Sequence, residues 1–218
     1  MIVTIDGPAG AGKSSISRQV AEQLGFEFLD TGAMYRAVAW AVLRQNRELT
    51  DASAVAEVAQ RLRIDLSGGK VLVDGEDATA EIRTPEVTQA TRYAASNVEV
   101  RAHLVELQQQ FGREKNLVTE GRDQGTVVFP HAECKIYLTA SPEERARRRV
   151  ADLAARGVPA EFDDILAQQN RRDEEDSSRE VGPLRKADDA VELCTDGMTP
   201  DEVIQRLIEI VEARKASL

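Results

Sequence analysis

The chain has 218 residues, with 28 Lys or Arg against 38 Asp or Glu, so its formal net charge at pH 7 is −10. Hydrophobic residues make up 42% of it, enough to bury a core, which excludes a chain disordered throughout. The acidic excess argues against polymeric nucleic acid or an anionic membrane as a partner, because both select for exposed positive charge. It leaves room for a small anionic ligand, which needs only a local cluster of donors.

Apolar strands alternate with helices along most of the chain, and this alternation predicts an α/β fold with a parallel sheet covered by helices on both faces. The helical patterns begin with Lys13–Leu24 and Gly32–Arg44. No apolar run approaches the ~20 residues that span a bilayer, so we expect a cytoplasmic protein without a membrane partner. The expected strands are Ile2–Ile5, Phe26–Leu29, Leu117–Thr119, Lys135–Thr139 and Ala190–Cys194.

The segment from Asp51 to about Asn97 interrupts this alternation. After a short helix to Arg61, the pattern predicts a β-hairpin that pairs Ile64–Leu66 with Val71–Val73 around a Gly-Gly turn. A hairpin between helices of an α/β domain indicates an insertion.

The turn after the first strand carries a phosphate-binding pattern, G-x-x-x-x-G-K-[ST], between a strand and a helix. Its glycines let successive N–H groups point at one anion, and the helix N-terminus adds positive potential. Lys13 would reach the terminal phosphates of ATP, and the Ser14 hydroxyl would ligate Mg²⁺. The residues expected to bind the donor nucleotide are Gly7, Pro8, Ala9, Gly10, Ala11, Gly12, Lys13, Ser14 and Ser15.

Two further motifs follow strands, at the edge where α/β sheets bind ligands. Thr31, Tyr35 and Arg36 come directly after the second strand; Tyr35 and Arg36 could equally be a core tyrosine and a surface arginine. Arg122 and Asp123 lie on a glycine-flanked turn after the third strand, where a structural salt bridge is the alternative.

Arginine gathers in two clusters of the C-terminal half. Arg145, Arg147, Arg148 and Arg149 precede a Gly-Val-Pro turn; they form either a solvated helix face or part of a mobile lid over a phosphate site. Further along, Arg172, Asp176 and Arg179 have the spacing of one helical face, which is either a surface ion-pair ladder or part of a nucleotide site.

Taken together, these motifs resemble the bacterial cytidylate kinases, a family of nucleoside monophosphate kinases, over essentially the whole chain. The resemblance implies a P-loop NTPase fold in three parts: a core of about 1–30, 101–145 and 188–218, a nucleoside-monophosphate-binding domain of about 31–100 containing a small antiparallel sheet, and an Arg-rich helical lid of about 146–187. The motifs that carry it are Ile5–Ser15, Asp30–Arg36, Glu81–Val87, Gly121–Pro130 and Arg172–Arg179.

The resemblance also implies the reaction, phosphorylation of CMP, and also dCMP, by ATP with Mg²⁺. It places Thr31, Arg101, Asp123 and Arg179 around the cytosine, Arg172 and Asp176 at the sugar, and Arg36 and Arg122 at the acceptor phosphate, with Tyr35 in the same site. Lys13, Arg36, Arg122, Arg148 and Arg149 are the expected catalytic residues.

Two other functions remain open from the sequence. The first is another P-loop kinase of a small molecule or nucleoside monophosphate, which would need a different acceptor site. The second is a non-enzymatic nucleotide-dependent switch, which would not need arginine spread over an acceptor site and a lid. We expect only small nucleotides as partners and a monomer.

Overall fold

The computed structural model describes residues 1–66, 68–155 and 157–218. The chain forms two compact units: unit 1 comprises Met1–Phe28 and Glu114–Leu218, and unit 2 comprises Leu29–Arg113. Among the described helices there is none with the length and apolar character that crossing a membrane requires.

A five-stranded sheet in the order β2-β6-β1-β7-β8 organises unit 1. Strand β1 pairs in parallel with β6 and β7, and β7 pairs in parallel with β8, which confirms the predicted parallel sheet. All five expected strands are present, with shifted ends. They are β1 (Ile2–Asp6), β2 (Glu27–Asp30), β6 (Leu117–Gly121), β7 (Cys134–Thr139) and β8 (Val191–Cys194).

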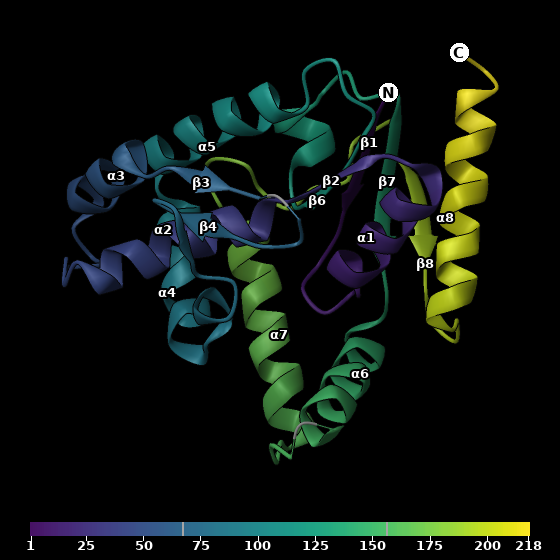
Figure 1. Ribbon diagram of the computed structural model, residues 1–218. Coiled ribbons are helices and arrows are strands. Elements are labelled where there is room, and N and C mark those ends of the chain that lie inside the picture. Colours follow the sequence, from purple (N-terminus) through teal and green to yellow (C-terminus); the bar gives the residue numbers. More distant parts are fainter. Residues whose placement is uncertain (67, 156) are drawn as a thin grey trace. The chain divides into compact units, whose positions relative to one another are not determined.

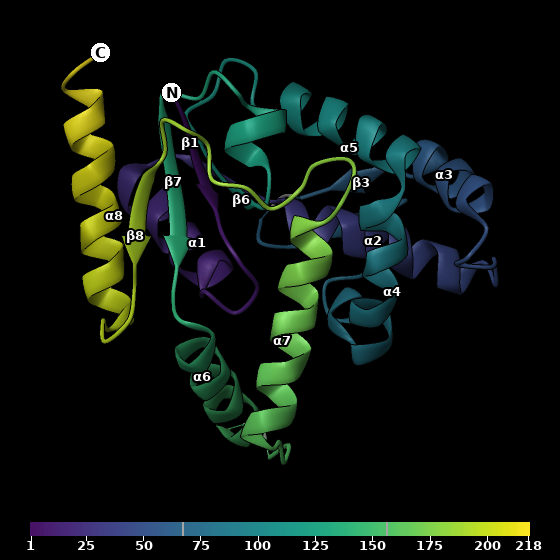
Figure 2. The same cartoon turned by 180° about the vertical axis from the view of Figure 1, so that it is seen from behind.

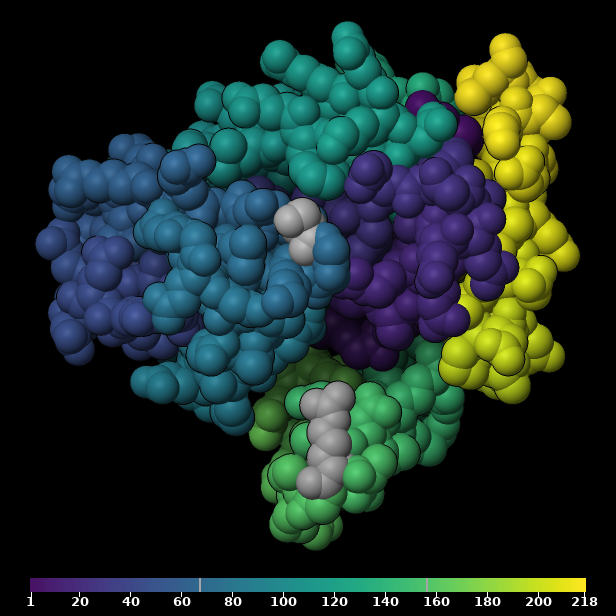
Figure 3. All heavy atoms as spheres, viewed as in Figure 1, coloured from purple at the N-terminus to yellow at the C-terminus, as the bar shows by residue number. Residues whose placement is uncertain are grey.

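Helices flank this sheet, as predicted. Val20 of α1 and Leu207 of α8 pack with Ile136 of β7 in one buried core, so the apolar stripe of each helix faces the strands. Figures 1 and 3 show α8, in yellow, with its other side at the surface. The helices of unit 1 are α1 (Lys13–Leu24), α6 (Pro142–Ala155), α7 (Phe162–Ser177) and α8 (Pro200–Lys215).

Helices α6 and α7 lie side by side as an antiparallel pair, and the stretch between α7 and β8 crosses one face of the sheet (Figure 2). Polar contacts attach this stretch to the rest of unit 1, and two of them lie at its middle and its end. Leu184 N donates to Asp176 O at 2.8 Å, and Lys135 Nζ donates to Asp189 Oδ1 at 3.0 Å. The end of α7 is therefore tied to the loop that leads back to the sheet.

Unit 2 is a group of helices with a small antiparallel sheet in the order β3-β4-β5. Ile64 pairs with Val73 and Asp65 with Leu72, which confirms the predicted hairpin; Ser67 in its turn lies outside the described residues. Strand β5 was not expected from the sequence. The elements are α2 (Thr31–Arg44), α3 (Ala52–Arg61), β3 (Ile64–Asp65), β4 (Leu72–Val73), β5 (Glu76–Asp77), the 3₁₀ turn η1 (Glu81–Arg83), α4 (Pro85–Ser96) and α5 (Val98–Phe111).

Candidate active site

The glycine-rich loop leaves β1 and enters α1 in unit 1. Gly7 has φ 152°, and a Cβ on it would lie 1.9 Å from the Leu138 carbonyl oxygen, so the backbone passes too close to β7 for any side chain. Gly12 has φ 81° and lies immediately before α1 begins at Lys13. The loop therefore ends on the N–H groups of a helix N-terminus, where backbone dipoles favour an anion.

Lys13 lies beneath this loop and is only 5% exposed. Its Nζ donates to Gly7 O and Pro8 O, each at 2.7 Å. Burial lowers the pKa of Lys13 to about 7, and the charge of Arg122 acts in the same direction, whereas Glu120 and Asp6 oppose the shift. A bound phosphate would favour the ammonium form, so binding and protonation of this side chain are linked.

Ser14 and Glu120 bring two oxygen ligands together at the mouth of the loop. The Ser14 hydroxyl donates to Glu120 Oε1 at 2.7 Å, and Glu120 lies near the carboxyl end of β6 with 5% exposure. Over the described ranges, no group of three or more His, Cys, Asp or Glu side chains could hold a metal. This donor set fits Mg²⁺, which commonly takes one or two protein oxygens and completes its shell with water and substrate phosphates.

Asp6, the last residue of β1, holds the turn that follows β6. Its carboxylate accepts hydrogen bonds from Gln124 N at 2.9 Å and Gly125 N at 2.7 Å. Burial raises the pKa of Asp6 to about 7, although these two N–H groups act in the opposite direction. The turn itself is a short π-helical segment, η2 (Gln124–Val128), so Arg122 and Asp123 are positioned by a buried carboxylate at its start.

Arg122, Asp176 and Arg179 form a compact charged group in unit 1. Arg122 Nε donates to Asp176 Oδ2 at 2.7 Å, and Arg179 donates to Asp176 Oδ1. Burial alone would raise the pKa of Asp176, but Arg122 and Arg179, and to a lesser degree Arg172, hold it below its usual value. The expectation that Arg179 shares a helical face with Arg172 and Asp176 is wrong, because α7 ends at Ser177 and the chain turns there.

The four arginines of α6 have different surroundings. Arg145 is 3% exposed and donates to Ala140 O at 3.1 Å and Ala9 O at 2.8 Å. Arg148 donates to Glu144 Oε1 at 3.0 Å, Thr195 Oγ1 at 3.0 Å and Thr195 O at 2.6 Å. The other two, Arg147 and Arg149, are exposed and differ in whether their side chains have a partner.

Arg147 is exposed and pairs with Glu144. Arg149 is exposed too, and within the described part of the chain its side chain makes no ion pair or hydrogen bond. Of the four arginines, Arg149 is therefore the one whose guanidinium has no partner in the ranges that the structure describes.

The remaining predicted site residues lie in unit 2. Thr31, Tyr35 and Arg36 occupy the first turns of α2, which Asp30 caps by accepting from Ala33 N at 2.9 Å. Thr31 and Tyr35 are buried and Arg36 is half-buried. Arg101 on α5 is 3% exposed; its guanidinium carbon lies 5.4 Å from the centre of the Tyr35 ring. The structure thus brings Tyr35 and Arg101 together.

Sequence reasoning missed four residues that contact the glycine-rich loop or the predicted site: Asp6, Glu120, Gln169 and Asp173. Asp6 is the last residue of β1 and Glu120 the last but one of β6, and position at the carboxyl end of a strand was a usable signal. Gln169 and Asp173 are four residues apart on α7, so they share the face of Asp176, but their contacts depend on tertiary packing.

Comparisons with known proteins bear on the whole chain. A family model described as cytidylate kinase matches residues 3–213. A cytidylate kinase from Rhodopirellula baltica is 52% identical over 211 residues, 97% of this chain and 92% of the relative. A cytidylate kinase from Bacillus velezensis is 45% identical over 216 residues, 97% of this chain and 96% of the relative.

Two other matches are a longer, bifunctional relative and a solved structure of low sequence identity. A bifunctional pantoate ligase/cytidylate kinase from Synechococcus sp. (strain CC9311) is 50% identical over 220 residues, and the matched region covers 98% of this chain but 44% of that longer relative. The solved structure of an uncharacterised protein from Eubacterium ventriosum has a TM-score of 0.53 at 9% identity and covers 98% of both chains, which shows the fold alone. From the family model and the two relatives of similar length, the chain belongs to the cytidylate kinase family.

Proposed function

We propose that this protein transfers the terminal phosphoryl group of ATP to CMP, and also to dCMP. The observation that carries the proposal is that one compact unit holds both a phosphate-binding loop, with Lys13 and Ser14, and the Arg122–Asp176–Arg179 group that the sequence predicts to bind a nucleotide. Membership of the cytidylate kinase family supports the same substrate.

The chemistry asks for positive charge and alignment rather than a general base. The attacking group is a phosphate oxygen of the acceptor, which is largely ionised near pH 7 because its second pKa is about 6. Two anionic phosphates must be brought in line and shielded from each other and from water. Lys13, Arg36 and Arg122 supply that charge where it develops in the transition state.

On the donor side, residues Gly7–Ser15 would cradle the phosphates of ATP with backbone N–H groups. Ser14 and Glu120 would hold Mg²⁺, directly or through water, and the ion would supply positive charge that offsets the charge of the phosphates. The pairing of these two oxygens at 2.7 Å is what supports this placement.

On the acceptor side, we assign Asp123, Thr31, Arg101 and Arg179 to the cytosine, Arg172 and Asp176 to the sugar, and Arg36, Arg122 and Tyr35 to the phosphate end. Asp123 is the residue we expect to discriminate between bases. A carboxylate accepts a hydrogen bond from the exocyclic amine of cytosine and opposes the carbonyl oxygen at the same position of uracil. Asp123 is 4% exposed, so an unmet bond there would be costly.

For the transferring phosphate, Arg149 is better supported than Arg148. Arg148 donates two hydrogen bonds to Thr195, which tie α6 to the residue after β8, and one to Glu144 of the same helix. Arg149 is exposed, and its side chain has no partner among the described residues. We assign α6 and α7, within the predicted lid of about 146–187, to closure over the site, 31–100 to acceptor binding, and the remainder to the core.

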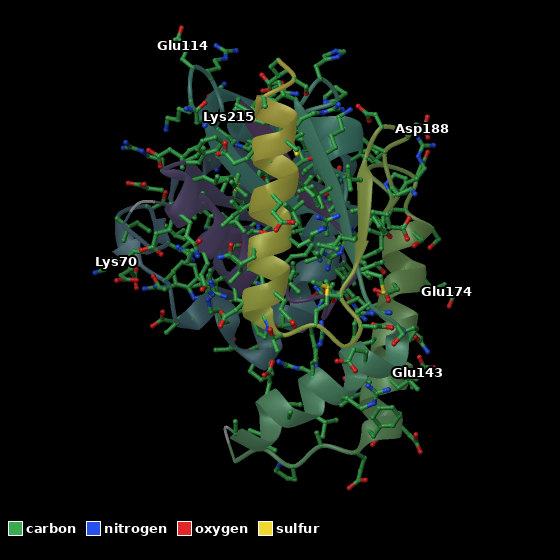
Figure 4. The ribbon with its side chains drawn as sticks, turned by 90° about the vertical axis from the view of Figure 1, so that its right-hand side faces the viewer. Lys70, Glu114, Glu143, Glu174, Asp188 and Lys215 are labelled. Carbon is green, nitrogen blue, oxygen red and sulfur yellow. The ribbon has the colours of Figure 1, made fainter. Side chains whose placement is uncertain are left out.

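Asp123→Asn tests the assignment of the base-reading residue. Its amide can donate to uracil, so the ratio of kcat/KM for CMP to that for UMP should fall at least about tenfold, as one base-edge hydrogen bond is worth about 1–3 kcal/mol. Asp188→Asn, at an exposed aspartate labelled in Figure 4, is the matched control and should leave the ratio unchanged. An unchanged ratio in Asp123→Asn would remove Asp123 from the base site.

A further inference from the structure

One carboxylate of helix α7, Asp173, contacts the glycine-rich loop at Ala9. Asp173 Oδ1 accepts a hydrogen bond from Ala9 N at 3.1 Å. Its other oxygen, Oδ2, pairs with Arg145 Nη1 at 2.6 Å, and the same nitrogen donates to Ala9 O at 2.8 Å. The backbone of Ala9 therefore binds a carboxylate from α7 through its N–H and a guanidinium from α6 through its carbonyl oxygen.

The two charged partners are held unequally. The Arg145 side chain is 4% exposed and is fixed at a second point by Ala140 O, so it belongs to the framework of unit 1. The Asp173 side chain is 19% exposed, and among the described residues it makes one hydrogen bond, to Ala9, and one ion pair, with Arg145. Of the pair, Asp173 is the more exposed, so it is the one that can separate from the loop and reach solvent, while Arg145 keeps its hydrogen bonds to Ala9 O and Ala140 O.

Helix α7 also carries residues that we assign to the acceptor nucleotide. Arg172 precedes Asp173, and Asp176 follows one turn later and binds Arg122. On the preceding turn, Gln169 packs over Gly10, where a Cβ would lie 2.6 Å from Gln169 Nε2. Because a helix moves largely as one body, a change at Asp173 is transmitted to Arg172 and Asp176.

We propose that Asp173 is a positioning residue that couples donor binding at the glycine-rich loop to acceptor binding by α7; this rests on the proposed function. A triphosphate in the loop repels the carboxylate of Asp173 and attracts Arg145, because both charges lie within hydrogen-bond distance of Ala9. Donor binding thus weakens the hold of Asp173 on the loop and lets α7 adjust to the acceptor. By reciprocity, the acceptor strengthens donor binding by the same factor.

Asp173→Asn keeps the shape of the side chain and removes its charge. The affinity for β,γ-methylene-ATP with Mg²⁺, measured by calorimetry, should rise about fivefold, since a charge-assisted hydrogen bond is replaced by a weaker neutral one that donor binding can break. In the wild-type protein the analogue should tighten CMP binding about fivefold, and in Asp173→Asn this factor should fall below about twofold.

Glu174→Gln is the matched control, because Glu174 is the neighbouring carboxylate on α7, is exposed, and points away from the helix in Figure 4. It should leave both factors at their wild-type values. Asp173→Glu retains the charge and should keep donor affinity closer to the wild-type value than Asp173→Asn does. If Asp173→Asn does not fold, as judged by thermal melting, Asp173→Ser carries the same expectation.

Unchanged or weaker donor binding in the neutral variants would overturn the proposal, as would a coupling factor equal to that of the wild type. Failure of the proposed function looks different. In that case the wild-type protein would not bind CMP at all, while the donor measurement would still report on the contact between Asp173 and Ala9.

Discussion

Alanine substitutions at Arg148 and Arg149, made one at a time, distinguish a residue that stabilises the fold from one that acts in phosphoryl transfer. The two residues are adjacent on α6. Arg148 loses hydrogen bonds of 3.0 Å to Glu144, 3.0 Å to Thr195 Oγ1 and 2.6 Å to Thr195 O. Its side chain is 28% exposed, so solvent recovers part of the loss, and we expect about 1–2 kcal/mol of destabilisation. For a chain of this size that corresponds to a fall in Tm of about 3–6 °C.

Arg149→Ala should leave the stability of the fold nearly unchanged and lower the rate of the reaction. Its side chain is exposed and within the described residues makes no hydrogen bond or ion pair, so its loss should change Tm by no more than about 1–2 °C. If its guanidinium meets the transferring phosphate, kcat should fall about 100-fold. Thermal melting and a coupled assay of ADP release from saturating ATP and CMP provide both readouts.

The reverse pattern would refute this reasoning: a large loss of kcat in Arg148→Ala at unchanged Tm, with near-normal turnover in Arg149→Ala. Arg147→Ala is the internal control, because Arg147 is exposed and pairs only with Glu144 among the described residues. It should change neither Tm nor kcat appreciably.

Two further predictions concern the glycine-rich loop. Because burial lowers the pKa of Lys13 to about 7, donor binding above that pH must take up a proton to form the ammonium. The Kd for an ATP analogue should therefore rise by up to about tenfold per pH unit above pH 7. A Kd that stays constant from about pH 7 to 9 would contradict the role of Lys13. Gly7→Ala places a Cβ 1.9 Å from Leu138 O and should lower the free energy of unfolding by more than about 3 kcal/mol, measured as a lower urea midpoint. An unchanged midpoint would be inconsistent with the close approach of β1 and β7.

The fold follows closely from sequence patterns. Short apolar runs predicted all five strands of the sheet. The residues Thr199, Pro200 and Glu202 form a hydroxyl-proline-acid pattern, which is typical of a capping box, and the structure contains that box in full. These features depend on residues within a few positions of one another, which is why the chain alone reveals them.

What the sequence could not predict depends on tertiary partners. The same pattern at Ser141 makes only one of the two hydrogen bonds of a capping box, from Glu144 N to Ser141 Oγ. Ser141 N donates instead to Asp196, 55 residues away, and the Glu144 carboxylate binds arginines. Asp173 looked like one acid among several on a charged helix, and only the folded chain brings it to Ala9.

Phosphorylation of CMP at this site can be measured directly as ADP release from ATP, with CMP, dCMP, UMP, AMP and shikimate compared as acceptors at equal concentration. We expect the highest kcat/KM for CMP, activity with dCMP, at least about tenfold weaker activity with UMP, and none above background with shikimate. Release that is equal for all five acceptors, or fastest with AMP or shikimate, would contradict this expectation.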